Sequence, residues 1–454
     1  MSRLEGVLGR AAVRSGDAIA PEYGIDETLK ARPVMPLAVV LPSSTDEVVA
    51  LVRVAVELGT PVTARGAGTG LSGACIPLAD GVVVSFERMA ALLEIDDAGH
   101  VAVVQPGLTL AALDEATAAH GLVYPVFPGT NAASLGGNVA TNAGGMRAVK
   151  YGVTRQHVLG VEAVLGTGEV IRCGGRYVKN TTGYDLTQLL IGSEGTLALV
   201  TEATLRLQPR MSHVASLLAP FATVDEVAAV VPSIVASGLQ PMILEYIDRA
   251  TMKGLLRLND LVLGVPQDVA DATEAYLVVV LEGRTAARLE EDVAEVAEHL
   301  LGRGAHDVFV LPAGQGAELL AARESAFWMV KAAGADDLID MVVPRHLIPT
   351  YLREVQRIAD GHGSKVYGCG HAGDGNIHFS VYESDDTRRS ALLHAIYAMG
   401  MSIGGAISGE HGIGRAKKNY YQALVDPTKL VLQRRIKAAF DPAGILNPGC
   451  IFDA

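Results

Sequence analysis

The spacing of apolar and polar positions predicts alternating helices and strands over the first two hundred residues. In residues 45–58, TDEVVALVRVAVEL, apolar side chains recur at helical spacing behind an N-capping Thr or Asp, and TPVTARG then predicts a short strand. GLTLAALDEATAAHG predicts a second helix, capped by Thr109 and stopped by Gly121. This part of the chain is therefore expected to be mixed α and β.

The pattern changes from about residue 213. Helical patterns such as VDEVAAVVPSIVASG and AARLEEDVAEVAEHLLGRG alternate with apolar runs such as AYLVVVLEG and HDVFVLP, which favours helices packed on an antiparallel sheet. Because 454 residues exceed what one hydrophobic core usually serves, we expect two or three domains.

Charge and composition exclude several classes of protein. With 37 basic and 50 acidic residues the formal charge is -13, so a nucleic-acid partner is not expected. No apolar run approaches membrane-spanning length, and the N-terminal residues do not form a secretory signal, which predicts a cytoplasmic protein that is not integral to a membrane. Four widely separated cysteines, at 75, 173, 369 and 450, indicate neither an iron–sulfur cluster nor a disulfide framework.

Three segments rich in small residues indicate a binding site. Gly68-x-Gly70-x-x-Gly73 formally matches the dinucleotide fingerprint, but Pro77 and the strand-like GVVVSF follow where that fingerprint requires a helix. The exposed backbone N–H groups of this loop could still cradle phosphates, although an ordinary surface loop has the same composition. Residues 125–152, and GSEGT at residues 192–196, add two more such segments, so a flat polar ligand is favoured.

Two histidines surround a turn in GHAGDGNIH, residues 370–378. A two-residue turn at Asp374-Gly375 would pair His371 with His378, with Cβ atoms ~4.5–5.5 Å apart on one face, which suits chelation of one ion. A pair of hydrogen-bonded core histidines is the structural alternative. SGEHGIGRAKK then offers Glu410 as a third ligand, unless that carboxylate is solvated, and His411 as a base. Two histidines and one carboxylate form a common open site for Zn, Mn or Fe.

The same motifs carry a family resemblance. PVTARGAGTGLSG, SLGGNVATNAGGMRAVKYG and IGSEGTLALVTEATL resemble the FAD-binding domain of the vanillyl-alcohol oxidase and p-cresol methylhydroxylase superfamily. GHAGDGNIH and SGEHGIG are similar to its D-2-hydroxyacid dehydrogenase branch, which includes the glycolate oxidase FAD subunit, D-lactate dehydrogenases and D-2-hydroxyglutarate dehydrogenases.

The resemblance implies an α+β fold in three parts. Residues 1–212 would form an FAD-binding domain of the p-cresol methylhydroxylase type, with two α/β subdomains. Residues 213–425 would form a ferredoxin-like, antiparallel-sheet substrate (cap) domain with the metal site, and the helical residues 426–454 would return to the FAD domain.

It also implies the residues of the site. Those expected to bind FAD are Arg65, Gly66, Ala67, Gly68, Thr69, Gly70, Leu71, Ser72, Pro128, Gly129, Ser134, Gly136, Gly137, Asn138, Ala140, Thr141, Asn142, Gly144, Gly145, Glu194, Gly195 and Asn447. RGAGTGLSG contains no histidine to link the flavin, so the FAD is expected to be non-covalent. Arg323, in AARESAF, aligns with an arginine that binds the substrate carboxylate, and Asn376 is assigned to the substrate as well.

The expected reaction oxidises a small D-2-hydroxy acid, of the D-lactate or glycolate type, to the 2-oxo acid. A divalent metal would take part, with His371, His378 and Glu410 as its ligands, and His411 would be the base. D-2-hydroxyglutarate is the alternative substrate. Enzymes for that diacid carry Thr and Lys where this chain has Phe327 and Leu338, although Lys331 could substitute. Cys450 stands where the family usually has Lys.

Two other classes of function fit the flavin fold. One is a non-redox transferase of the alkylglycerone-phosphate synthase type, whose catalytic pattern is not evident in SGEHGIG, and the other is a flavin-storing or structural metal protein. Without clustered cysteines, electrons would leave the flavin directly to a quinone, an electron-transfer flavoprotein, a partner subunit or oxygen. A second copy of the chain, in a homodimer, is a further candidate partner.

Overall fold

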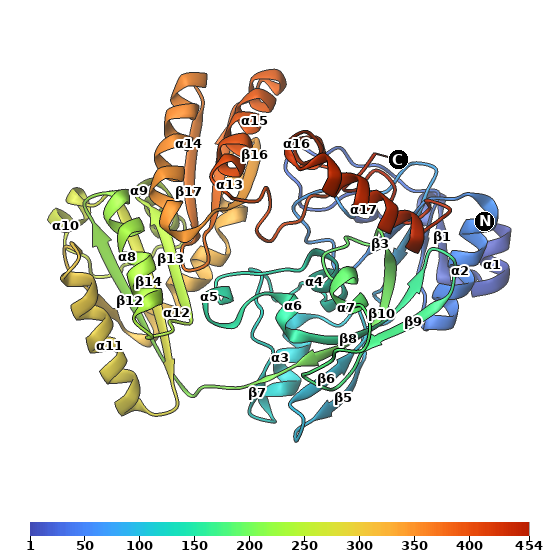
Figure 1. Cartoon of the computed structure of the whole chain (residues 1–454), viewed down its shortest axis with the longest axis horizontal. Helices are drawn as coiled ribbons and strands as arrows, with labels where there is room; N and C mark the ends of the chain where they lie inside the picture. The colour runs from blue at the N-terminus through green and yellow to red at the C-terminus, as the bar shows by residue number, and fades with distance from the viewer. Residues whose placement is uncertain (454) are drawn as a thin grey trace. The chain divides into compact units, whose positions relative to one another are not determined.

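The computed structural model describes residues 1–453, which form two compact units (Figure 1). Unit 1 comprises residues 1–143, 153–210 and the chain from Glu410 onwards, whereas unit 2 comprises residues 144–152 and 211–409. Over residues 1–453, no helix combines the length and the apolar character needed to cross a membrane.

The first sheet of unit 1 has the strand order β1-β2-β4-β3, in which β2, β4 and β3 are parallel and β1 is antiparallel. Its strands are β1 (Val13–Ser15), β2 (Ala38–Val40), β3 (Val62–Arg65) and β4 (Val82–Ser85). Helix α1 (Ser2–Leu8) precedes it, and α2 (Thr45–Leu58) buries an apolar face that includes Val48 and Leu51. The hydroxyl of Ser44 caps α2, which ends at Gly59 with φ 61°. The helix expected at 45–58 and the strand after it are confirmed.

The second sheet of unit 1 is antiparallel, with the order β5-β6-β10-β8-β9. The strands are β5 (Leu92–Asp96), β6 (Val101–Val104), β8 (Val158–Leu165), β9 (Val170–Gly174) and β10 (Ala198–Arg206), and β7 (Leu122–Val123) pairs separately with β11 (Gln208–Pro209). Four helices belong to this half: α3 (Leu110–Ala118), α4 (Leu135–Thr141), α6 (Thr154–His157) and α7 (Leu186–Leu190). Thr109 caps α3, as expected.

The C-terminal chain of unit 1 contains α16 (Lys418–Leu424) and α17 (Pro427–Phe440). Beyond α17, Leu446 forms a parallel bridge with Val62 of β3, and its side chain joins the core of the first sheet. The end of the chain is thereby built into the sheet that begins near residue 13.

Unit 2 is built on a seven-stranded antiparallel sheet with the order β15-β12-β14-β13-β17-β18-β16. The strands are β12 (His213–Phe221), β13 (Ile243–Asp248), β14 (Ala275–Gly283), β15 (Phe309–Leu311), β16 (Asp337–Val342), β17 (Lys365–His371) and β18 (Asn376–Tyr382). The first four strands follow the ferredoxin-like order, in which the fourth lies beside the first and the third beside the second. The expected antiparallel, ferredoxin-like architecture is therefore present.

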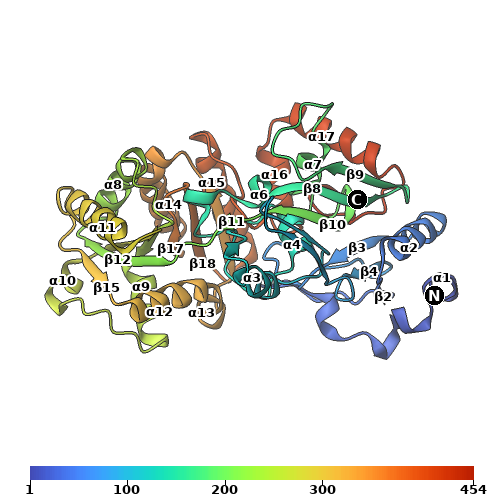
Figure 2. The same ribbon diagram turned by 90° about the horizontal axis from the view of Figure 1, so that it is seen from below.

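Helices cover both faces of this sheet (Figure 2). One layer consists of α8 (Val224–Ala236), α11 (Ala286–Leu301), α14 (Ile348–His362) and α15 (Asp386–Ser402). The other face carries α9 (Arg249–Leu258), α12 (Ala313–Glu324) and α13 (Ala326–Ala332), and the short α10 (Gln267–Ala272) precedes β14.

A short segment that interrupts unit 1 in sequence, residues 144–152, belongs to unit 2. Residues 144–152 contain α5 (Ala148–Tyr151), and their Met146 packs in the core of unit 2. The Lys150 ammonium lies 2.8 Å from the carboxylate of Glu282 on β14. A Cβ atom on Gly373, in the turn between β17 and β18, would lie only 2.4 Å from Val149. The segment 144–152 therefore packs against the turn that joins β17 and β18, the strands that carry His371 and His378.

Candidate functional site

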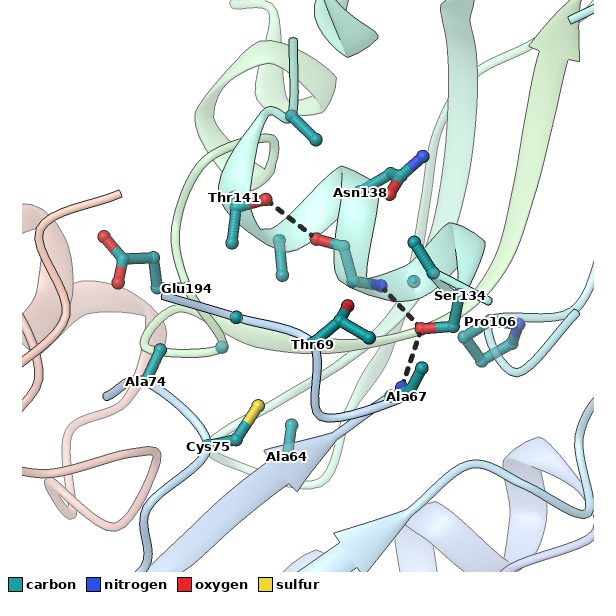
Figure 3. Close-up of a pocket in the computed structure, with 18 of the residues that line it drawn as sticks. Ala64, Ala67, Thr69, Ala74, Cys75, Pro106, Ser134, Asn138, Thr141 and Glu194 are labelled. Carbon is teal, nitrogen blue, oxygen red and sulfur yellow. Dashed lines mark hydrogen bonds between the residues drawn. The ribbon is translucent and has the colours of Figure 1, made fainter. Parts of the chain in front are cut away.

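A large pocket in unit 1 collects the small-residue segments that the sequence singled out (Figure 3). Its cavity volume is ≈ 180 Å³, and it is partly open to solvent. Its walls come from the loop after β3, from the segment that includes α4, and from the chain around residues 190–200. Glu410 and His411 also line it.

Close backbone packing shapes the pocket where β3 ends. The Ser134 hydroxyl accepts hydrogen bonds from the backbone N–H groups of Ala67 (3.2 Å) and Gly137 (3.3 Å), and so ties two walls together (Figure 3). A Cβ atom on Gly66 would lie 2.0 Å from that hydroxyl oxygen, so this position requires glycine. By contrast, a Cβ atom on Gly70 or Gly195 would meet no neighbour closer than 3.5 Å, so the missing side chains leave room for a ligand.

Glu194 anchors the C-terminal chain of unit 1 to the pocket. Its backbone has φ 52°, and its carboxylate accepts hydrogen bonds from the N–H groups of Ile413 (2.8 Å) and Gly414 (2.7 Å). Burial raises the pKa of this carboxyl above its ordinary value, although those two N–H groups oppose the shift. The Asn447 amide donates to the carbonyl oxygens of Ala74 and Glu194, at 2.9 Å each.

Most of the expected FAD-binding residues line this pocket. They are Gly66, Ala67, Gly68, Thr69, Gly70, Leu71, Ser72, Pro128, Ser134, Gly136, Gly137, Asn138, Ala140, Thr141, Glu194 and Gly195. Arg65, Gly129, Asn142 and Asn447 belong to unit 1 but do not line it, and Gly144 and Gly145 belong to unit 2. The Arg65 guanidinium donates to the carbonyl oxygen of Ile25 at 2.7 Å and lies against Gly68, so it supports the loop from behind.

Sequence reasoning missed several lining residues, among them Cys75, Phe86 and Pro106. They lie outside the small-residue segments, so composition alone gave no signal for them. Burial raises the pKa of the Cys75 thiol to about 12, which keeps it protonated at neutral pH.

A second cluster of polar side chains lies within unit 2, on one face of its sheet. Glu245 on β13 stands opposite His371 on β17, and Asp340 on β16 stands opposite His378 on β18. Since directly opposed residues point to the same face, four ionisable side chains form a row across four neighbouring strands.

The predicted pairing of His371 with His378 is wrong in its register. His371 stands opposite Asn376, and His378 stands opposite Cys369, because the turn has four residues, 372–375, instead of two. The N–H groups of Asp374 and Gly375 both donate to the His371 carbonyl oxygen at 3.1 Å, which closes this longer turn. Gly375 has φ 90°, a conformation that favours glycine.

The two imidazoles are neighbours nevertheless. A shift of two residues preserves the face to which a side chain points, so His371 and His378 become diagonal neighbours on adjacent strands. Their ring centroids lie 5.0 Å apart, with the ring planes at 81°. The prediction that these two rings share one face of the hairpin is therefore confirmed, although the strands pair in a different register.

Glu245, like Asp340, is a fully buried acid of this cluster, with 0% exposure. One carboxylate oxygen accepts a 2.5 Å hydrogen bond from Nδ1 of His371, and the other lies 2.9 Å from Nη2 of Arg323. Burial favours the neutral acid, but the charges of His371 and Arg323 outweigh it and hold the pKa of Glu245 below its ordinary value. Its sequence context, ILEYID, gave no sign of this role.

Asp340 occupies the other end of the row and was also missed. Its carboxylate accepts hydrogen bonds from the side chains of Asn376 (2.8 Å) and Ser408 (2.6 Å), and lies 3.7 Å from Nδ1 of His378. Each histidine thus has a buried carboxylate close to its Nδ1. This is the usual environment of metal-binding histidines, so the residues of unit 2 fit a divalent ion.

The third predicted ligand, Glu410, and the predicted base, His411, belong to unit 1. Glu410 and His411 are its first residues after unit 2, and the Glu410 carboxylate lies 3.9 Å from Nε2 of His411. The joining of Glu410 to the two histidines in one metal site stays a prediction, as does the role of His411.

The three positions that the family resemblance links to the substrate class are on α13 and β16. Phe327 and Lys331 are on α13, where the Lys331 ammonium lies 5.7 Å from the Phe327 ring and 5.1 Å from the Trp328 ring. Cation–π contact at these distances holds the ammonium against the helix surface. Leu338 is on β16, two residues from Asp340 and therefore on the same face of the sheet.

Two family models match the chain. Residues 36–174 match the FAD binding domain, and residues 210–451 match the C-terminal domain of FAD linked oxidases. An uncharacterized FAD-linked oxidoreductase of Mycobacterium tuberculosis is 54% identical over 99% of this chain and 98% of its own. The D-lactate dehydrogenase of Archaeoglobus fulgidus is 39% identical, over 94% of each chain.

Solved structures agree in fold. The structure of p-cresol methylhydroxylase with substrate bound covers 100% of this chain and 96% of its own, with a TM-score of 0.80 at 16% identity. The architecture expected from the sequence motifs is therefore confirmed. Together, the pocket, the two domain matches and the relatives show that this chain belongs to the FAD-linked oxidase family, as an FAD-dependent oxidoreductase of the p-cresol methylhydroxylase type of fold.

Proposed function

We propose that this oxidoreductase converts a small D-2-hydroxy acid, such as D-lactate or glycolate, to its 2-oxo acid. The observation that carries the proposal is the polar row of unit 2, where Arg323 and His371 contact the buried Glu245 carboxylate and the His378 ring lies beside that of His371. A guanidinium suits a substrate carboxylate, and adjacent imidazoles suit a metal that binds a hydroxyl group. The name of the A. fulgidus relative supports the same class of substrate.

Each group has a defined task in this proposal. FAD, held without a covalent bond by the pocket of unit 1, supplies the acceptor for the hydride of the substrate. A divalent ion such as zinc, held by His371, His378 and Glu410, would lower the pKa of the substrate hydroxyl. Arg323 binds the carboxylate and sets the orientation of the substrate, and His411 takes the hydroxyl proton.

The side chains of Phe327, Lys331 and Leu338 favour a short, uncharged substituent over a second carboxylate. Leu338 offers no charge, and the Lys331 ammonium is engaged by Phe327 and Trp328. A diacid would therefore have to pull Lys331 away from its aromatic contacts, at a cost of about 0.5–1 kcal/mol for an exposed cation–π pair. D-2-hydroxyglutarate remains the second substrate to test.

Anaerobic reduction of the flavin tests the proposal directly. The purified yellow protein is mixed with D- and L-lactate, glycolate and D- and L-2-hydroxyglutarate, and flavin absorbance is followed without oxygen. We expect bleaching by D-lactate or glycolate, slower bleaching by D-2-hydroxyglutarate, and none by the L-acids. No bleaching by any 2-hydroxy acid would refute the proposal.

Replacing His411 tests the proposed base. His411→Ala should retain FAD and zinc but slow flavin reduction by ~10²–10⁴-fold, the usual contribution of a general base. His394→Ala is the matched control, because His394 is exposed on α15 of unit 2. Equal reduction rates for His411→Ala and the control would exclude His411 as the base.

A further inference from the structure

Glu245 is a charged residue in an apolar setting. On β13 it lies between Ile243 and Ile247, which point to the same face and belong to the apolar core of unit 2. Carboxylates are almost never fully buried unless they are paired. Replacing a buried ion pair by well-packed apolar side chains is often neutral or stabilising, so stability alone does not account for a glutamate here.

The two contacts of Glu245 reach two groups with different proposed tasks. Oε1 accepts the hydrogen bond from Nδ1 of His371, and Oε2 pairs with the Arg323 guanidinium. His371 comes from the neighbouring strand β17, whereas Arg323 comes from helix α12. One rigid carboxylate thus fixes a strand side chain and a helix side chain relative to each other.

We propose that Glu245 is a positioning residue that orients both the metal-binding His371 and the substrate-binding Arg323. The inference rests on the function proposed above and adds a residue to it. Glu245 itself contacts neither the metal nor the substrate in this scheme.

The hydrogen bond to His371 has a specific chemical effect. A carboxylate on Nδ1 keeps the proton on that nitrogen, so Nε2 presents its lone pair, and the ring becomes a stronger ligand. The pair with Arg323 acts on geometry and on charge. It holds the planar guanidinium in one orientation and offsets part of its positive charge, so the substrate carboxylate is bound without being held too tightly for release.

Zinc affinity measures the first effect without any turnover. The full-length flavoprotein is stripped of metal by a chelator and titrated with Zn²⁺ in a calorimeter, as the wild type and as Glu245→Gln. We expect Glu245→Gln to bind zinc about 10–100-fold more weakly, the usual effect of removing a carboxylate behind a metal-binding histidine. Wild-type affinity in Glu245→Gln would overturn the proposal.

Glu383→Gln is the matched control. Glu383 is 7% exposed in unit 2, follows the end of β18, and pairs with Arg388 and Ser364 at 2.9 Å each. Its replacement also removes the charge of a carboxylate that is itself buried and hydrogen-bonded, but neither histidine is involved. Zinc affinity should therefore be unchanged in this variant, and an equal loss in both variants would mean that Glu245 acts only on general stability.

A second variant covers the case in which Glu245→Gln fails to fold. Glu245→Asp keeps the charge but shortens the side chain by one methylene, so its carboxylate cannot keep both contacts. We expect the zinc affinity of Glu245→Asp to lie between those of the wild type and Glu245→Gln. If the shorter side chain loses the contact with Arg323, KM should rise. If it loses the contact with His371, kcat should fall. Full wild-type values for Glu245→Asp would overturn the positioning role.

Nitrogen NMR of the histidine rings separates this inference from the proposed function. In ¹⁵N-histidine-labelled, metal-free protein, the His371 signal, assigned with His371→Gln, should show a protonated Nδ1 in the wild type and lose that preference in Glu245→Gln. If the wild type binds zinc but no 2-hydroxy acid reduces its flavin, the proposed function fails alone. If the His371 signal and the zinc affinity are the same in both proteins, the role of Glu245 fails alone.

Discussion

The contact between Gly66 and Ser134 offers a quantitative test of the flavin pocket. In Gly66→Ala the new methyl group would lie 2.0 Å from the Ser134 hydroxyl oxygen, so the hydroxyl must rotate away. It then loses the hydrogen bonds from the N–H groups of Ala67 and Gly137. At about 0.5–1.5 kcal/mol each, the expected loss in the free energy of unfolding is about 1–3 kcal/mol.

Thermal unfolding of the flavin-free protein measures that loss. For a unit of this size, each kcal/mol lowers Tm by about 2–4 °C, so Gly66→Ala should lower the Tm of unit 1 by about 2–12 °C. Flavin occupancy should fall as well, because the two pocket walls joined by Ser134 separate. Occupancy is read from the ratio of flavin to protein absorbance after gel filtration.

Gly70→Ala is the matched control for the same loop. Gly70 lines the same pocket, but its new methyl group would meet only an Asp26 oxygen, at 3.6 Å, which is an ordinary contact. The Tm of flavin-free Gly70→Ala should therefore stay within about 1–2 °C of the wild type. Equal Tm values for the two alanine variants would refute the assignment of Gly66 as a packing-restricted position.

Three further outcomes are expected. Arg323→Gln removes one charged partner of the buried Glu245 carboxylate and leaves it with the hydrogen bond from His371. The free energy of unfolding of unit 2 should therefore fall by up to about 3–5 kcal/mol in urea titrations, and an unchanged midpoint would contradict the pairing of Arg323 with Glu245. Because burial raises the pKa of Cys75 to about 12, its thiolate forms only at high pH. Alkylation of Cys75 by iodoacetamide, read by mass spectrometry, should be negligible at pH 8 and should rise about tenfold per pH unit above it. The alkylation rate of a free thiol of pKa ~8.5 would level off over the same pH range. Gly361→Ala, in helix α14 with open space around it, should stabilise unit 2 by about 0.5–1 kcal/mol in the same urea titrations, and destabilisation would contradict the open space around it.

Local sequence signals predicted the parts of the fold that depend on nearest neighbours along the chain. The helix at 45–58 forms as predicted, although its cap is Ser44 and not the expected Thr or Asp, and the helix after Thr109 begins where its cap requires. The small-residue segments were recognised for the same reason, because glycine and alanine permit close backbone approach wherever the chain places them. Family motifs supplied the flavin, which composition alone did not identify.

The histidine turn shows where local rules stop. Asp374-Gly375 has the composition of a two-residue turn, yet the chain forms a four-residue turn at 372–375. Gly375 packs so closely on the Val343 carbonyl oxygen that a Cβ atom there would lie 2.2 Å from it, and Val149 packs on Gly373. These partners are distant in sequence, so their effect on the turn could not be read from its residues.

The sequence by itself determined the helices, the glycine-dependent loops, the family, and the presence of two histidines near one turn, because each depends on residues close together in the chain or on a recognisable motif. Only the tertiary structure decided which acids accompany those histidines. Glu245 precedes His371 by 126 positions, and Asp340 meets His378 through the pairing of β16 with β18. A carboxylate is stable in a buried position only where a charged or hydrogen-bonding partner offsets the cost of removing it from water. Which residue becomes that partner depends on the sheet register, and long-range packing sets the register.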